Sequence, residues 1–167
     1  DHYLAGLYVA RIEKLGIAPL AEELTRIDAI DGPKSLAAAL ARLALIANEP
    51  VLAGVGVSTD PVDRTRYLVT AHEPALTAPS KEVYLEADMQ PVRDGLLRYI
   101  ADMLALAGAP GDTATAQAQR ILAIETRVAA KKLDPVDEAN PSKLDTKMSY
   151  ADLKALAPAI DWAAYLD

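Results

Sequence analysis

The chain has 167 residues, of which 51% are hydrophobic and 25% are charged, as expected for one soluble domain with a real core. With 17 basic and 24 acidic residues it carries a net charge of −7, which argues against nucleic-acid binding. It has no cysteine, which excludes disulfides, thiolate metal sites and cysteine nucleophiles, and no apolar run reaches membrane-spanning length.

Apolar residues at helical spacing predict three helices before residue 50. In the first, the apolar stripe comprises Leu4, Tyr8, Ile12 and Leu15. The second begins at Pro19 and has Leu20, Leu24, Ile27 and Ile30 on one face. The third places Leu36, Leu40 and Leu43 inward and ends near Pro50.

The pattern then changes from helical spacing to short β-branched runs. Residues 51–57 and 66–70 predict two antiparallel strands, joined by a turn-rich loop. We therefore expect a hairpin over about residues 51–72. Asp60 and Asp63 beside Pro61 are interpreted as turn-forming residues, with Arg64 and Arg66 balancing their charge.

Two long helices are predicted after the hairpin, over about 91–107 and 112–132. The first should turn Val92, Leu96, Tyr99, Ile100, Met103 and Leu104 inward, with Asp94 and Arg98 on its other side. Ser149 to Asp152 has the form of a capping box, and Asp161 precedes a last turn. The expected fold is mainly α, one helical domain over 1–167 with one small antiparallel β-hairpin.

Histidine content limits the possible metal chemistry. The chain has two histidines, His2 and His72, and no His-Glu-x-x-His motif to present paired imidazoles to zinc. We therefore predict no metal ligands and no catalytic residues in this chain.

Glu125 is the carboxylate with the most unusual predicted environment, because it lies near the apolar face of the second long helix. A buried carboxylate needs a cation or hydrogen-bond donors. A structural ion pair with Arg93 or Arg98 is the main interpretation, and a catalytic carboxylate is the lesser one.

Several short motifs follow one another along the chain, and their order is informative. They are residues 27–30 (IDAI), 54–60 (GVGVSTD) with Arg66 and Tyr67, 79–85 (PSKEVYL), 122–127 (LAIETR), 135–148 (PVDEANPSKLDTKM) and 161–166 (DWAAYL). Together they resemble the N-terminal helical region of the neprilysin-like zinc metalloendopeptidases, the M13 peptidases. The sequence departs from the family at Ala75, Thr77, Ala78 and Asn140, where partner surfaces are expected to have changed.

The resemblance implies a non-catalytic helical portion that walls the substrate chamber, whereas zinc is expected only in a catalytic region missing from this chain. Its implied partners are the catalytic domain or chain of the same peptidase, or a peptide substrate. The family also suggests a periplasmic or extracellular location. Whether this chain is an enzyme stays open.

The alternative is a stand-alone, diverged domain that acts as a binding module or as a small repurposed enzyme without zinc. The candidate binding residues are Asp60, Arg64, Arg66 and His72 of the hairpin and Tyr84 of the loop that follows it. By analogy with the family, the hairpin and residues 74–84 are expected to face the rest of the peptidase.

Overall fold

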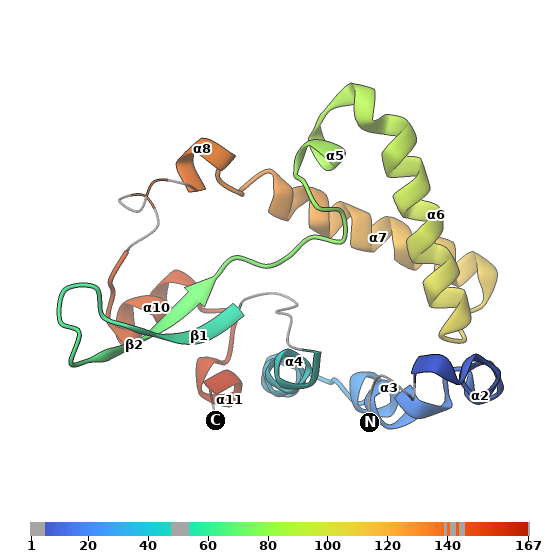
Figure 1. Ribbon diagram of the computed structural model, residues 1–167, viewed down its shortest axis with the longest axis horizontal. Helices are drawn as coiled ribbons and strands as arrows, with labels where there is room; N and C mark the ends of the chain where they lie inside the picture. Colours follow the sequence, from blue (N-terminus) through green and yellow to red (C-terminus); the bar gives the residue numbers. More distant parts are fainter. Residues whose placement is uncertain (1–5, 48–53, 139, 141–142, 144–145, 167) are drawn as a thin grey trace.

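The fold is mainly helical and open in outline in the computed structural model, which describes residues 6–47, 54–138, 140, 143 and 146–166 (Figure 1). The N-terminal arm comprises α2 (Val9–Leu15), the 3-10 turn η1 (Ala18–Leu20), α3 (Ala21–Asp28) and α4 (Pro33–Ala47). Then come β1 (Gly54–Thr59), β2 (Tyr67–His72), α5 (Glu82–Leu85), η2 (Ala87–Met89), α6 (Gln90–Leu106) and α7 (Gly111–Ala129). The chain continues with α8 (Pro135–Glu138), α10 (Tyr150–Leu156) and α11 (Trp162–Leu166). The predicted fold class is confirmed.

The hairpin pairs β1 with β2 antiparallel, from Gly54 opposite His72 to Thr59 opposite Tyr67. Because side chains alternate across a strand, Val57 and Val69 lie on one face, and there they are 71% and 66% exposed. Leu68 lies on the other face and is half-buried. The more apolar face of the hairpin is therefore the open one.

The helices α6 and α7 cross and pack against each other, and α5 packs against α7 (Figure 1). Gly108, at φ 99°, turns the chain between them in a conformation that favours glycine. On α7 the buried positions are alanines, which lets the neighbouring elements approach closely. The core cluster here comprises Ala78, Val83, Tyr84 and Ala129, with Leu76, Leu96 and Leu122 packed against it.

A second packed region joins α11 to α4. Trp162 is buried, and its ring N–H donates to the backbone oxygen of Ala157 at 3.1 Å. Ser149 and Asp152 form the predicted capping box at the start of α10, with each side chain bonded to the other residue's backbone N–H. This local prediction is confirmed.

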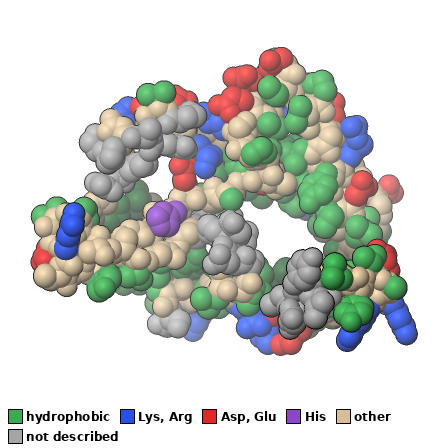
Figure 2. All heavy atoms as spheres, in the orientation of Figure 1, with side chains coloured by type: hydrophobic (Ala, Val, Ile, Leu, Met, Phe, Trp, Pro, Cys, Tyr) green, Lys and Arg blue, Asp and Glu red, His purple; other side chains and the backbone are tan. Residues whose placement is uncertain are grey.

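Several predicted core stripes are open in the structure. On α6, Val92, Tyr99 and Met103 were expected to face inward but are 51%, 55% and 49% exposed, so this expectation is wrong for them. On the N-terminal arm Tyr8, Ile12 and Leu15 are exposed too. Figure 2 shows apolar side chains across the α6–α7 side and an opening between α7 and the α3–α4 arm.

Candidate functional site

The residues at the centre of the candidate site join the loop after the hairpin to α7. One carboxylate oxygen of Glu125 accepts hydrogen bonds from the Thr77 backbone N–H at 2.9 Å and from the Thr77 hydroxyl at 2.7 Å. The other oxygen accepts from the Tyr84 hydroxyl at 3.0 Å. Three donors, two from Thr77 in the loop after β2 and one from Tyr84 on α5, thus converge on one carboxylate of α7.

Tyr84 connects this carboxylate to the loop. Its side chain is buried, and its hydroxyl oxygen accepts the backbone N–H of Ala78 at 2.8 Å while it donates to Glu125. Burial raises the pKa of Tyr84 to about 12, and the neighbouring Glu125 carboxylate adds to the rise. The hydroxyl therefore keeps its proton at neutral pH and acts as a donor.

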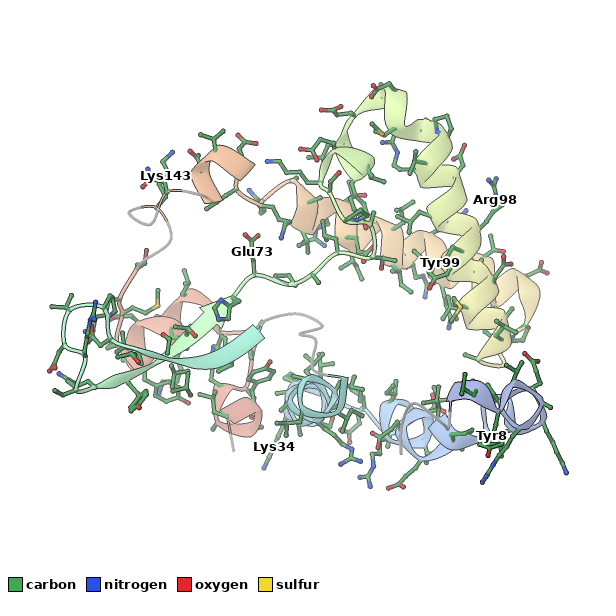
Figure 3. All side chains as sticks on the ribbon, in the orientation of Figure 1. Tyr8, Lys34, Glu73, Arg98, Tyr99 and Lys143 are labelled. Atoms are coloured by element: carbon green, nitrogen blue, oxygen red, sulfur yellow. The ribbon has the colours of Figure 1, made fainter. Side chains whose placement is uncertain are left out.

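The expected arginine partner of Glu125 is wrong. Arg93 donates to the backbone oxygens of Val83 at 2.8 Å and Glu86 at 2.6 Å, and to the Gln90 side chain. Arg98 is exposed and projects outward from α6 (Figure 3). In the described part of the chain no ion pair reaches Glu125. Neutral donors replace the cation because the loop, rather than an arginine, packs over this side of α7.

Asp60 forms the second link between distant segments. It is 1% exposed, and one of its oxygens accepts the backbone N–H of Val62 at 2.9 Å. The other accepts from the Lys147 ammonium group at 2.6 Å. The hydrogen bond from Lys147 and then that from Val62 lower the pKa of Asp60 to about 2.

This geometry corrects one expectation about the hairpin: Lys147, not Arg64 or Arg66, balances the charge of Asp60. Asp60 is buried and held by hydrogen bonds, and its role as a binding residue stays a prediction. Arg64 and Arg66 are exposed on the hairpin. His72 is exposed at the end of β2, where its Nε2 lies 3.1 Å from the Thr70 hydroxyl oxygen.

The five candidate binding residues are therefore not gathered in one place. Asp60, Arg64 and Arg66 lie at the hairpin turn, whereas Tyr84 lies on α5 at the far end of the connecting segment (Figure 1). Reasoning from single residues missed Lys147 as the partner of Asp60 and Thr77 as a partner of Glu125. The ordered motifs contain residues that pair in the structure: Asp60 bonds to Lys147 of another motif, and Tyr84 bonds to Glu125 of another.

A groove lies beside α7, between this helix and the segment that follows β2. Its larger part has a volume of about 650 Å³ and is lined by Glu73, Pro74, Ile124, Arg127, Val128, Ala130, Lys131 and Lys132. A smaller hollow of about 170 Å³ shares Pro74, Ile124 and Val128 with it and extends to Leu76 and Ile121. Figure 3 shows Glu73 directed from the segment toward the α7–α8 side, where it pairs with Lys132 at 3.0 Å.

The described residues do not fit a catalytic zinc ion. Within the described ranges, no three or more His, Cys, Asp or Glu side chains form a group that suits a metal ion. His2 lies outside the described residues, so the absence of metal ligands stays a prediction for the whole chain. No helix in the described part has both the length and the apolar character needed to cross a membrane.

Comparisons with known proteins identify the family of this chain. Residues 1–167 match Peptidase family M13, in its N-terminal region. Endothelin-converting enzyme 1 of Cavia porcellus is 28% identical over 174 residues, which cover 99% of this chain and 23% of that protein. The human enzyme is also 28% identical, with 99% and 22% covered.

Solved structures support the same family assignment. The Mycobacterium tuberculosis zinc metalloprotease Zmp1 in its open state superposes with a TM-score of 0.87 at 30% identity, covering 96% of this chain and 25% of that one. Its complex with an inhibitor gives a TM-score of 0.84, again at 30% identity, over 93% of this chain and 24% of that one. The chain spans about a quarter of these relatives, and it belongs to the N-terminal domain of peptidase family M13.

Proposed function

We propose that this chain is a non-catalytic helical portion of a neprilysin-like zinc metalloendopeptidase and that it walls the substrate chamber of the whole enzyme. Its partner is the catalytic domain or chain of the same peptidase. The zinc ion, the general base and the transition-state donors belong to that partner, because the described residues offer no ligand set for the metal.

The observation that carries the proposal is the excess of exposed surface. A compact monomer of 17.8 kDa exposes about 8,000 Å². This chain exposes 12,366 Å², an excess of about 4,000 Å². Obligate interfaces bury roughly 2,000 to 5,000 Å² summed over both partners, so this excess on one partner is large enough for such an interface, in which each partner completes the other's core.

The exposed side chains indicate where the partner docks. Tyr99 and Met103 on α6, Val57 and Val69 on the hairpin, and Tyr8 on the N-terminal arm are all about half exposed or more. Exposed apolar side chains on several elements are typical of surfaces that another part of a protein covers. The M13 relatives supply the polypeptide that would cover it, since this chain matches only about a quarter of their length.

A chimera tests the proposal. The matching quarter of the M. tuberculosis zinc metalloprotease is replaced by this chain, and zinc-dependent cleavage is measured with a short peptide and with an unfolded protein. We expect the chimera to cleave the short peptide and to discriminate against the long chain, whereas the protease without this quarter should lose that discrimination.

Matched variants of the chimera test the docking face. Tyr99→Lys with Met103→Lys changes two open apolar side chains of α6, and Arg98→Ala changes an exposed polar neighbour. We expect the lysine pair to destabilise the chimera and the control to leave its stability unchanged. The proposal is wrong if both variants behave like the parent, or if the chimera cleaves long and short substrates as the truncated protease does.

The groove beside α7 supports a second candidate, a stand-alone binding module without zinc. It lies away from the strands of the hairpin and combines apolar and charged lining residues. This function predicts a stable, monomeric 167-residue chain that binds a ligand with no peptidase present. Light scattering of the isolated chain separates it from the first candidate, which predicts a folded chain that self-associates through its exposed apolar surface.

A further inference from the structure

We propose that Asp31 is an isoaspartate-forming site and that the Ser35 hydroxyl holds it closed while the first turn of α4 is intact. The modification reroutes the main chain through the side-chain carboxyl carbon of Asp31 and leaves the mass of the protein unchanged. It goes beyond the chamber-wall function and does not depend on it. The sequence, the space around the backbone and the hydrogen bonds at this corner lead to the assignment.

The first feature is the Asp31–Gly32 step, which lies between α3 and α4. A glycine after an aspartate leaves the backbone nitrogen open to approach, because glycine has no Cβ to hinder it. A Cβ at Gly32 would meet no atom within 4 Å, and the positive-φ glycines of the described chain are Gly16 and Gly108. The fold therefore accepts alanine at this position, whereas the reaction favours glycine.

The reaction needs only the chain and water. The Gly32 nitrogen attacks Cγ of Asp31, an N–Cγ bond forms, and one carboxylate oxygen leaves as water with the amide proton and a proton from solvent. The five-membered imide then adds water. Opening at the α-carbonyl breaks its bond to the Gly32 nitrogen, which regains a proton, and frees an α-carboxylate whose proton returns to solvent. Opening at Cγ instead restores aspartate.

The second feature is Ser35, which holds both reacting groups. Its Oγ accepts the backbone N–H of Gly32 at 3.1 Å and donates to Oδ1 of Asp31 at 2.7 Å. The same Oγ accepts the Asp31 N–H at 3.1 Å, and the Gly32 carbonyl oxygen, 3.0 Å away, is a second acceptor for its proton. That carbonyl also accepts the Leu36 N–H at 2.9 Å, at the start of α4. Ring closure must break the hydrogen bonds of the Gly32 nitrogen and the Asp31 carboxylate, so it follows opening of this turn.

The third feature is a second Asp-Gly step that lacks such a serine. The sequence has two of these steps, and the other, Asp94–Gly95, lies inside α6. There the backbone N–H of Gly95 belongs to the helical hydrogen-bond ladder, and the Asp94 carboxylate accepts from the Gln90 side chain at 2.8 Å. One step is therefore closed by a helix and the other by a single hydroxyl. Asp94 is the internal control for Asp31.

The test follows isoaspartate in the 167-residue chain during incubation at neutral pH in heavy-oxygen water. Each hydrolysis of the imide adds one heavy oxygen, and electron-transfer dissociation of tryptic peptides distinguishes isoaspartate from aspartate. A synthetic copy of residues 27–34, the tryptic peptide that contains Asp31, gives the rate without a fold. We expect the intact chain to isomerise at Asp31 more slowly than this peptide. Ser35→Ala should raise the rate in the chain roughly tenfold, as expected for the loss of one hydrogen bond to a charged group.

Matched variants separate the hydroxyl from general stability. Ser35→Thr keeps a hydroxyl and should keep the slow rate, whereas Gly32→Ala added to Ser35→Ala should slow the reaction again. The rate at Asp94 should be the same in every chain. An intact chain that reacts as fast as the free peptide or as fast as Ser35→Ala, a Ser35→Thr variant as fast as Ser35→Ala, or no slowing by Gly32→Ala would each overturn the proposal. A rise at Asp94 together with Asp31 would also overturn it, because it would report general unfolding.

Discussion

Removal of the Glu125 carboxylate tests the best-defined contact in the structure. In Glu125→Ala, the Thr77 backbone N–H, the Thr77 hydroxyl and the Tyr84 hydroxyl all lose their acceptor. These bonds span 41 to 48 residues of sequence, so they hold the loop and α5 against α7. The variant should therefore destabilise this packed region as a unit.

The magnitude follows from the burial of the three donors. Thr77 is exposed, so water can replace the carboxylate at about 0.5 kcal/mol for each of its two bonds. The Tyr84 hydroxyl is buried, and an unsatisfied buried donor costs about 2 kcal/mol. The free energy of unfolding should fall by about 3 kcal/mol, a large part of the stability of a typical domain.

Urea unfolding followed by circular dichroism measures this loss. Tyr84→Phe should cost about 2 kcal/mol, because the Ala78 N–H also loses its acceptor. Glu125→Ala combined with Tyr84→Phe should cost about 2 kcal/mol less than the sum, since the double variant lacks the Tyr84 hydroxyl that Glu125→Ala leaves unsatisfied. Asp102→Ala, an exposed carboxylate on α6, is the control and should cost less than about 0.5 kcal/mol.

Two results would refute this reasoning. A loss below about 1 kcal/mol in Glu125→Ala would mean that the loop does not depend on the carboxylate. Strict additivity in the double variant would mean that Tyr84 and Glu125 act independently, contrary to the 3.0 Å contact between them.

Three further predictions concern other parts of the chain. The pKa of Asp60 is about 2, below its ordinary 3.8, so its stabilising contribution should be complete above about pH 4 and lost as the pH falls toward 2. Urea midpoints measured against pH should show this decline, and Lys147→Met should flatten it. Gly108→Ala should destabilise the α6–α7 turn by about 1 kcal/mol in thermal unfolding, because φ there is 99°. Zinc titrated into the purified chain should not bind stoichiometrically by calorimetry, and no chelator-sensitive peptide cleavage should accompany it; a one-to-one complex would contradict the interpretation of the two histidines.

Local patterns predicted the elements well. The helices expected over about 91–107 and 112–132 are α6 and α7, at 90–106 and 111–129. The strands are shifted by only a few residues, and the capping box at Ser149 is as expected. These features depend on contacts within a few residues of chain, so the sequence alone carries the information that determines them.

The partners of the Asp60 and Glu125 carboxylates could not be predicted in the same way. Asp60 meets Lys147 across 87 residues, and Glu125 meets Thr77 across 48. Arg64 and Arg66 are close to Asp60 in sequence, and Arg93 and Arg98 lie on the helix that packs against α7, yet packing brings other donors closer. The ordered family motifs held the right residues, but their order does not say which motif contacts which.

The sequence by itself determined the helices, the hairpin and membership in peptidase family M13, because periodicity and motif order are properties of the linear chain. Only the tertiary structure decided which apolar stripes are covered, since burial depends on what packs against each face. The stripe of α6 is the clearest case: its spacing predicts burial, yet Tyr99 and Met103 stay half exposed. Spacing identifies an apolar face, whereas the arrangement of the other elements decides whether this chain covers it.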